Sequence, residues 1–325
     1  MTFKQEKAFR KLVNKARRIA ILSHIDSDHD SLCSSFALQE MLVAYGKVAN
    51  VYLDKLPSAN YDAILEGRQV LLADNQKYDL AIVLDLSEVK RLGSCAGMLT
   101  NASAIVNIDH HPEVDDFANL VFRTTSTSSA CEILFWLTYK FLPYNNEVAK
   151  LLYIGIHADS GGFAYTGVNQ DTFKCIAELY KFDNDYSLIV EEYLNNWSLK
   201  EFQLGARAMQ SVSMHLKNQV AVSFLSMKDF KDLDTTRADS KFIVAVLKTV
   251  QPVRVAVSIC EERSKYYRVS IRATGNGVDV SRVAKAFGGG GHKKASGFDA
   301  KGDIKKVVNK IVGLCAQMLD VQGER

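Results

Sequence analysis

The sequence predicts an α/β protein in which a doubly wound, mainly parallel sheet is followed by a second, smaller α/β domain with a mixed sheet. Its 325 residues exceed the size of one ordinary compact domain, so two domains are expected. In the first half, short apolar runs alternate with helical patterns, which is typical of a parallel sheet covered on both faces. After about residue 170 the pattern changes to helices and then strands, which indicates a second α/β unit.

The expected strands of the first domain are apolar runs at 19–22, 48–53, 80–86 and 104–109, separated by helical patterns such as 31–45. An amphipathic helix before them should bury Phe9, Leu12, Val13 and Ala16. In the second half we expect helices at 171–182 and 199–216, strands at 219–225, 254–260 and 266–272, a glycine-rich element at 288–291 and a final helix. We assign residues 1–188 to the first domain, 189–215 to a helical connector and 216–325 to the second domain.

Composition excludes several classes of protein. Forty basic against 37 acidic residues give a formal charge of +3, which provides no general attraction for long duplex nucleic acid. The six cysteines are scattered without a CxxC pair, as in an intracellular protein with reduced thiols. No stretch approaches the roughly 20 apolar residues that span a bilayer. We therefore expect a cytoplasmic protein without a membrane partner, and a homodimer is compatible with this composition.

Carboxylate and imidazole side chains follow three of the predicted strands. They are His24, Asp28 and Asp30 after the first, Asp85 at the end of the third, and Asp109, His110 and His111 after the fourth. Because ligands of parallel sheets bind beyond the carboxyl ends of the strands, these side chains should meet at one edge. For the first cluster alone, a solvated acidic turn that caps the helix near Ser31 explains the residues equally well.

A fourth segment, residues 155–163, adds Asp159 beside glycines that let backbone approach a ligand closely. Imidazole and carboxylate ligands without a thiolate favour manganese or a similar divalent ion. Two such ions about 3.5 to 4 Å apart, bridged by a carboxylate, would promote hydrolysis of a phosphate ester. Nucleophilic serine chemistry is disfavoured because the sequence contains no G-x-S-x-G motif.

The second half contains the run Gly288 to Gly291 followed by His292, whose backbone amides could bind an anion. A flexible turn is the ordinary explanation for such a run. Upstream, Arg268, Ser270 and Arg272 alternate along a predicted strand and so share one face. That face suits phosphate or base contacts, although a solvated strand face has the same pattern.

Together these segments resemble the DHH phosphoesterase superfamily, and within it the stand-alone nano-RNase and pAp-phosphatase type. The resemblance covers nearly the whole chain in five ordered motifs: His24…Asp28-x-Asp30, Asp85…Arg91-x-Gly93, Asp109-His110-His111, Gly155…Asp159-Ser-Gly-x-Phe163 and the terminal GGGGHKKASG. In this family the first domain is catalytic and binds metal, and the smaller second domain binds substrate through the last motif.

The resemblance implies roles for individual residues. One Mn²⁺ would be bound by His24, Asp28 and Asp85, and a second by Asp30, Asp85, His110 and Asp159, with Asp85 as the bridge. His111 would face the scissile phosphate or orient the surroundings of the nucleophile, Asp109 would support the neighbouring histidines, and Arg91 would support the site. In the second domain, nucleotide binding would fall to Ser270, Arg272, Gly290 and His292.

The chain departs from the family pattern at several positions that are not metal ligands. These are Ser27, His29 and Cys33 in the first motif, Glu113-Val114 after the third, and Gly167-Val168-Asn169 after the fourth. They bear on substrate preference more than on reaction type. His29 could add a ligand or a hydrogen bond at the metal edge.

The implied activity is hydrolysis of RNA of two to five residues, of linear dinucleotides such as pApA and pGpG, or of pAp, to mononucleotides. An inorganic pyrophosphatase shares the N-terminal motifs but lacks the glycine-histidine element. A catalytically silent nucleotide sensor is the alternative from another class, and the complete set of ligand residues argues against it. A processive exonuclease is disfavoured because such relatives are much longer.

Overall fold

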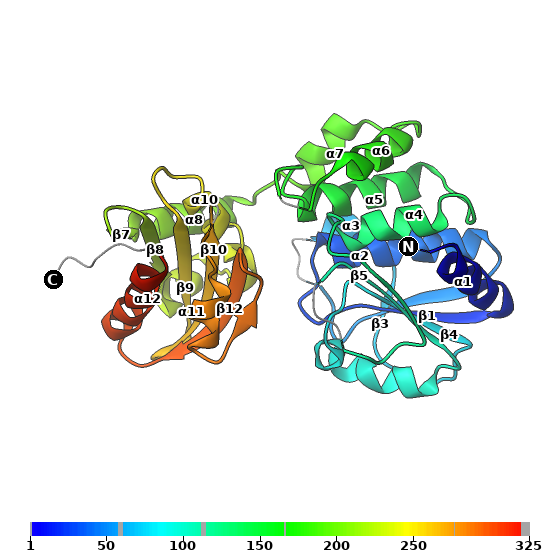
Figure 1. Ribbon diagram of the computed structural model, residues 1–325, viewed down its shortest axis with the longest axis horizontal. Helices are drawn as coiled ribbons and strands as arrows, with labels where there is room; N and C mark the ends of the chain where they lie inside the picture. Colours follow the sequence, from blue (N-terminus) through cyan, green and yellow to red (C-terminus); the bar gives the residue numbers. More distant parts are fainter. Residues whose placement is uncertain (1, 58–60, 112–114, 166, 276, 320–325) are drawn as a thin grey trace. The chain divides into compact units, whose positions relative to one another are not determined.

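The computed structural model describes residues 2–57, 61–111, 115–165, 167–275 and 277–319. The chain forms two compact units, Met1–Asn196 and Trp197–Arg325, coloured blue to green and green to red in Figure 1. The division falls inside the segment 189–215, which the sequence marked as a connector. Each unit has its own sheet and its own core, and each is described separately below.

The first unit is built on a six-stranded sheet in the order β3-β2-β1-β4-β5-β6, and all its pairings are parallel. The strands are β1 (Arg18–Leu22), β2 (Val48–Tyr52), β3 (Val70–Leu71), β4 (Leu80–Leu84), β5 (Ile105–Asp109) and β6 (Leu120–Arg123). The predicted doubly wound parallel sheet is thereby confirmed. The two edge strands, β3 and β6, were not predicted, because runs of two and four residues carry little periodic signal.

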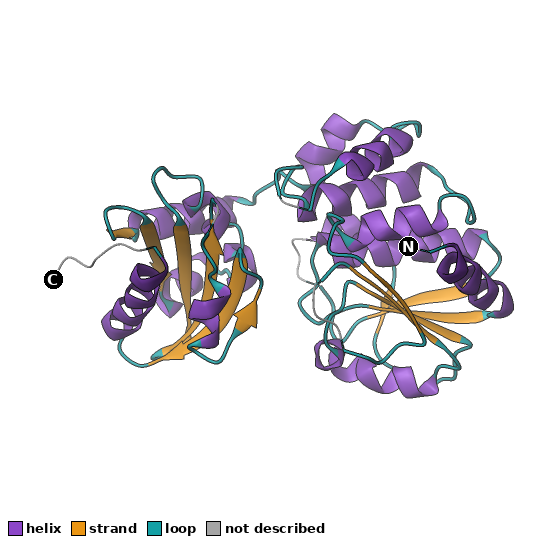
Figure 2. Cartoon of the chain, in the orientation of Figure 1, coloured by secondary structure: helices purple, strands orange, loops and turns teal. Residues whose placement is uncertain are grey.

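Helices cover both faces of this sheet (Figure 2). They are α1 (Phe3–Lys15), α2 (His29–Ala44), α3 (Asp62–Leu65), η2 (Val89–Asn101), α4 (Ala130–Thr138), α5 (Asn146–Asp159), α6 (Gln170–Leu179) and α7 (Tyr186–Tyr193). Ile19 and Ile21 of β1 point into the core shared with α1, α2, α4 and α5, whereas Ala20 and Leu22 point into the core beside η2. A strand buried on both faces has no polar position, which explains its continuous apolar run.

The strand order places the chain reversal between β1 and β4, which lie side by side at the centre of the sheet. One path winds outward from β1 through β2 to β3, and the other from β4 through β5 to β6. The loops that follow β1 and β4 therefore diverge, and parallel sheets bind their ligands at such a reversal. Both loops carry predicted site residues, His24 and Asp85.

The second unit has a mixed sheet in the order β11-β12-β10-β9-β8-β7, in which only β8 and β9 run parallel. Its strands are β7 (Ser213–His215), β8 (Val220–Leu225), β9 (Val255–Arg263), β10 (Tyr266–Ala273), β11 (Gly290–Gly291) and β12 (Ala295–Lys301). Its helices are α8 (Leu199–Gln210), α9 (Met227–Leu233), η3 (Arg237–Ser240), α10 (Ile243–Leu247), α11 (Ser281–Lys285) and α12 (Ile304–Met318). The predicted mixed sheet is confirmed.

The expected helix 199–216 is wrong in its last part. Helix α8 ends at Gln210, and Ser213–His215 instead forms β7, an edge strand antiparallel to β8. Pairing with Val222 and Ala221 of β8 supplies backbone hydrogen bonds that local helical propensity does not reveal. Outside the gaps at 58–60, 112–114, 166 and 276, no helix between residues 2 and 319 combines the length and the apolar character needed to cross a membrane.

Helix α1 offers a matched test of core packing in the first unit. Phe9 is completely buried, with its ring edge-on to Phe122 at 5.8 Å, whereas Phe3 in the same helix is 80% exposed. We expect Phe9→Ala to lower the free energy of unfolding by about 3 to 5 kcal/mol, because it leaves a cavity in a close-packed core. Phe3→Ala should change it by less than about 0.5 kcal/mol. Urea unfolding monitored by circular dichroism measures both, and equal effects would contradict the assigned packing of α1.

Candidate active site

The loop after β1 brings the first three ligand candidates to the start of α2. Asp28 caps this helix, since its Oδ1 accepts a hydrogen bond from the Ser31 amide at 2.9 Å. Its second oxygen, Oδ2, lies 3.7 Å from Nε2 of His24. Asp28 therefore serves as the helix cap that the sequence left as an alternative, and still presents one carboxylate oxygen to the cluster.

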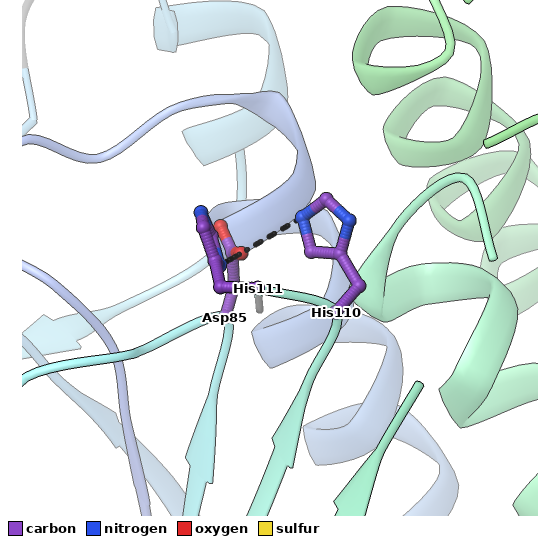
Figure 3. Close-up of side chains that lie close together, drawn as sticks. All are labelled: Asp85, His110 and His111. Carbon is purple, nitrogen blue, oxygen red and sulfur yellow. Dashed lines mark ion pairs between the residues drawn. The ribbon is translucent and has the colours of Figure 1, made fainter. Parts of the chain in front are cut away.

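Asp85 directly follows β4 and lies at the centre of the site. Its Oδ2 is 3.3 Å from Nε2 of His24, and its Oδ1 is 3.5 Å from Nε2 of His110. Figure 3 shows the His110 ring turned toward this carboxylate at the ends of adjacent strands. Asp85 is only 3% exposed, yet its buried Oδ1 accepts no hydrogen bond from any described residue. Its backbone adopts a left-handed φ of 52°, a strained conformation for a residue with a side chain.

The side chains form three overlapping groups of potential metal ligands, each with its ligand atoms within 4.8 Å of one another. The groups are His24, Asp28 and Asp85; Asp30, His110 and Asp159; and Asp85, His110 and His111. Asp159, at the end of α5, places Oδ2 3.3 Å from Nε2 of His110. The six residues proposed as metal ligands thus converge from β1, α2, β4, β5 and α5.

The electrostatics of this cluster call for positive charge. Burial, together with Asp85 and Asp159, raises the pKa of Asp30 well above its ordinary value. Burial likewise raises the pKa of Asp159 to about 7, with a further contribution from Asp85. Burial would lower the pKa of His110, but the ion pair with Asp85 and the nearby carboxylates outweigh this effect and raise it to about 10. Divalent cations would balance the charge of these carboxylates, and the oxygen and imidazole donors suit such ions.

The Asp85 carboxyl behaves in the opposite way. Burial alone would raise its pKa, but ion pairs with His110 and His24 lower it below the ordinary range. The pKa of Asp85 is thus lowered where those of Asp30 and Asp159 are raised. A buried carboxylate between two imidazoles is able to contribute a ligand oxygen to a divalent cation.

Asp109 and His111 form a pair at the edge of the cluster. Asp109 is completely buried, and its Oδ1 lies 2.7 Å from Nδ1 of His111. Burial would lower the pKa of His111, but this hydrogen bond and the charge of Asp85 raise it. The carboxylate fixes the ring orientation, with Nδ1 turned toward Asp109 and Nε2 on the opposite side of the ring.

A contact that the sequence did not reveal holds Asp30. The first two amides of α4, from Ala130 and Cys131, donate to its Oδ2 and Oδ1 at 2.7 and 2.9 Å. A helix N-terminus stabilises a carboxylate through such amides and through its dipole. Gly155 of α5 lies close to this contact, since an added Cβ would come within 2.3 Å of Cys131 Sγ and 3.3 Å of Asp30 Oδ1. The glycine of the fourth motif therefore permits the close approach of α4 and α5.

Arg91 and Gly93 support the loop after β1. The carbonyl of Arg91 accepts a hydrogen bond from the Ile25 amide at 2.8 Å, next to His24. Gly93 has a φ of 56°, and an added Cβ would meet Asp54 Oδ1 at 2.4 Å and Ile25 Cγ2 at 2.9 Å. Arg91 is half-buried and does not belong to any of the three ligand groups among the described residues.

The departures from the family pattern have visible local roles. The Ser27 hydroxyl donates to the His24 carbonyl at 3.3 Å, which closes the ligand loop. His29 joins no ligand group among the described residues; its Nε2 lies 3.1 Å from the carbonyl of Tyr193, at the end of α7. Cys33 is fully buried in the core of the first unit. Glu113 and Val114 lie outside the described residues.

The four candidate residues of the second unit come together across β12. Ser270 of β10 pairs with Gly297, and Gly290 of β11 pairs with the same residue from the other side. One pair further along, Arg272 lies opposite Ala295, which exchanges backbone hydrogen bonds with His292 at 2.7 and 3.1 Å. Cross-strand partners share a face, so only small side chains separate Ser270 and Arg272 from Gly290 and His292.

The glycine run begins in a turn at Gly288 and ends in a short strand. Gly290 and Gly291 form β11, and an added Cβ on Gly291 would lie 2.7 Å from both the Ala295 carbonyl and the Ser296 Cα. At Gly290 an added Cβ would meet nothing within 4 Å. The predicted common face of Arg268, Ser270 and Arg272 is confirmed by the alternation of half-buried and buried residues along β10.

Comparison with known proteins identifies the family. Residues 18–156 match the DHH family, N-terminal domain, and residues 217–317 match the DHHA1 domain. The Bifunctional oligoribonuclease and PAP phosphatase NrnA of Mycoplasma genitalium is 30% identical over 247 residues, 75% of each chain. The chain therefore belongs to the DHH/DHHA1 phosphoesterase superfamily, as its motifs predicted.

Within this superfamily the chain has NrnA-like relatives. The Probable bifunctional oligoribonuclease and PAP phosphatase NrnA of Streptococcus mutans is 29% identical over 297 residues, which cover 90% of this chain and 94% of the relative. The fold matches the crystal structure of an exopolyphosphatase-related protein from Bacteroides fragilis with a TM-score of 0.90, 23% identity and 98% of each chain covered. The similarity to that structure concerns the fold alone.

Asp85 and Asp79 flank the same strand and allow a matched test of metal binding. Asp79 precedes β4 and accepts hydrogen bonds from the amides of Arg17 and Arg18, at the end of the strand away from the cluster. We expect Asp85→Asn to weaken Mn²⁺ binding by more than about 100-fold, since even outer contacts of metal ligands are worth 10- to 100-fold. Asp79→Asn should leave it unchanged. Isothermal titration calorimetry on the folded variants measures this, and wild-type affinity in Asp85→Asn would rule out the bridging assignment.

Proposed function

We propose that this protein is a phosphodiesterase and phosphatase that uses two divalent cations, Mn²⁺ in the simplest case, to hydrolyse very short oligonucleotides, linear dinucleotides or pAp to mononucleotides. The observation that carries the proposal is the position of Asp85. One of its oxygens faces the ligand group of His24, and the other faces His110 of the second group. This division suits a carboxylate shared by two ions.

Two ions bound by these groups would act as Lewis acids on phosphate oxygens and lower the pKa of a water molecule enough to attack phosphorus near neutral pH. The protein's own contribution is to fix the ligands before substrate binds. Asp28 is held as a helix cap, Asp30 by the amides of α4, and Asp85 by the strained turn after β4. Ligands fixed in this way need little reorganisation during the reaction.

His111 and Arg91 would provide the remaining functional groups of the site. With Nδ1 bound to Asp109, a protonated His111 would donate a hydrogen bond from Nε2 to a phosphoryl oxygen or to the leaving group. The half-buried Arg91 would contribute a positive charge that complements the phosphate. Neither role requires a metal ligand to change its position.

The proposed substrate class rests on the NrnA-like relatives and on the second unit. Names of these relatives combine oligoribonuclease and PAP phosphatase activities, and the matched region includes the DHHA1 domain. Ser270, Arg272, Gly290 and His292 offer a guanidinium, an imidazole, a hydroxyl and an open glycine backbone. This combination is suited to a terminal phosphate or a sugar, and a substrate of a few nucleotides would engage it.

The first test concerns reaction and substrate class. With Mn²⁺ present, the protein should release AMP from pApA and should act much more slowly per end on a strand of about two dozen nucleotides. Asp85→Ala should reduce turnover of pApA far more than tenfold, a loss exceeding about 1.4 kcal/mol of transition-state stabilisation. Mononucleotide and orthophosphate release are followed by chromatography. Rapid hydrolysis of pyrophosphate without hydrolysis of pApA would replace the proposal with a pyrophosphatase.

The second test separates the two units, with Arg268 as the control. Arg268 shares a strand face with Arg272; its guanidinium pairs with the Asp299 carboxylate at 3.1 Å, whereas that of Arg272 donates to the carbonyls of Ile271 and Ser296. We expect Arg272→Ala and His292→Ala each to lower kcat/KM for pApA by at least tenfold, because remote contacts orient the reacting phosphate. Arg268→Ala should lower it less than threefold.

A small activated ester, such as a nitrophenyl phosphodiester, serves as the control substrate for these variants. It lacks the remote groups that Arg272 and His292 would contact, so both variants should hydrolyse it at the wild-type rate. Asp85→Ala should fail on this substrate as well. If Arg272→Ala and His292→Ala slow pApA and the ester by the same factor, these residues do not bind substrate.

A further inference from the structure

A buried carboxylate outside the metal cluster has no role in the mechanism described so far. Glu132 lies in the first turn of α4, is completely buried and forms no ion pair with any described residue. Its Oε2 accepts three hydrogen bonds, from the Ser128 amide at 2.9 Å, the Ser128 hydroxyl at 2.6 Å and the Thr172 hydroxyl at 3.0 Å. Burying a carboxylate is costly, so this arrangement requires an explanation.

These hydrogen bonds fix the turn that starts α4. Ser128 and Glu132 are four residues apart and bracket Ser129, whose hydroxyl caps the helix by accepting from the Glu132 amide at 3.1 Å. The two residues after Ser129 are Ala130 and Cys131, whose amides donate to Asp30. The hydrogen bonds of Glu132 therefore enclose the short segment that holds a proposed metal ligand.

The same turn is supported from outside by the start of α6. Thr172 of α6 supplies the third hydrogen bond to Glu132, and the side-chain amide of Asn169 donates to the Ser126 carbonyl at 2.5 Å. Gly167 lies against this turn so closely that an added Cβ would come within 2.8 Å of the Thr127 carbonyl. Gly167 and Asn169 are positions where the chain departs from its family, and both contact this turn.

We propose that Glu132 is a positioning residue for the metal site formed by Asp30, His110 and Asp159. By anchoring Ser128 and Thr172, it fixes the first amides of α4 where they hold both oxygens of Asp30 in the orientation seen in the cluster. Among the described residues, no hydrogen bond joins Glu132, Ser128 or Thr172 to the second site, formed by His24, Asp28 and Asp85. Glu132 should therefore act on one ion and not on the other.

The inference rests on the metal ligands named under the proposed function, and it differs from a purely structural role in a measurable way. A residue that only stabilises α4 would change the free energy of unfolding and leave metal affinity alone. A positioning residue would change the affinity of one ion, because Asp30 would lose its fixed orientation while the fold persists. Metal affinity without substrate is therefore the informative quantity.

The variants are Glu132→Gln and Ser128→Ala, with Thr138→Val as the matched control. Gln keeps the size of Glu132 but is a weaker acceptor, and Ser128→Ala removes one hydroxyl donor while retaining the amide. Thr138 is equally buried at the other end of α4, where its hydroxyl donates to the Leu134 carbonyl at 2.7 Å and contacts the Tyr144 hydroxyl at 2.7 Å. Its replacement perturbs the same helix away from Asp30.

Titration calorimetry with Mn²⁺ alone should resolve two binding events, one for each ion, in the wild-type protein. Glu132→Gln should weaken one of them about tenfold or more, Ser128→Ala should weaken the same ion to a smaller extent, and Thr138→Val should weaken neither. Near-wild-type circular dichroism establishes that each variant is folded. If Glu132→Gln does not fold, Ser128→Ala provides the test.

Wild-type affinity for both ions in the folded variants, or equal weakening in Thr138→Val, would overturn the role of Glu132. Absence of Mn²⁺ binding by the wild-type protein would instead overturn the proposed metal ligands themselves.

Discussion

The carboxylate of Asp85 faces two imidazoles at once, and most features of the first unit serve this arrangement. His24 lies on one side of it and His110 on the other, each at hydrogen-bond or ion-pair distance from a different oxygen. Asp28, Asp30 and Asp159 complete the surroundings, so four carboxylates share a small and largely buried volume. Protons or bound cations relieve such repulsion, and the raised pKa values of Asp30 and Asp159 reflect it.

The fold meets the requirement by placing the cluster at the reversal point of a parallel sheet. Adjacent strands β1, β4 and β5 deliver His24, Asp85 and His110 from three loops to one edge. Helices then provide fixed dipoles and amides: α2 is capped by Asp28, and α4 directs its first amides at Asp30. The strained backbone of Asp85 is retained because neighbouring strands and loops determine its conformation.

Much of this arrangement could be predicted from the sequence, because the information is local. Apolar runs locate the central strands, and the acidic and histidine residues at their ends identify the edge where they meet. Edge strands β3 and β6 are too short to be seen in this way, and β7 depends on pairing with β8 rather than on its own residues. The resemblance to a family supplied the individual ligand assignments, which spacing alone does not determine.

Contacts between distant segments account for what the sequence could not reveal. The hydrogen bonds from α4 to Asp30 join residues about a hundred positions apart, and the sequence around either residue does not predict them. In the sequence, Glu132 is an ordinary acidic residue in the first turn of a helix. In the structure it is buried and accepts hydrogen bonds from Ser128 and Thr172. The sequence allowed His29 to serve as a metal ligand or hydrogen-bond donor at the site. Its ring instead contacts Tyr193 and Tyr61, because the first residue of α2 faces the end of α7.

The most direct measurement of the bridging arrangement is a crystal structure of the Mn²⁺-loaded protein with anomalous diffraction collected at the manganese edge. Two peaks about 3.5 to 4 Å apart are expected, with one oxygen of Asp85 bound to each ion or one oxygen shared between them. His24 and Asp28 should contact one peak, and Asp30, His110 and Asp159 the other. A single peak, or two ions that Asp85 does not join, would contradict the central role assigned to this carboxylate.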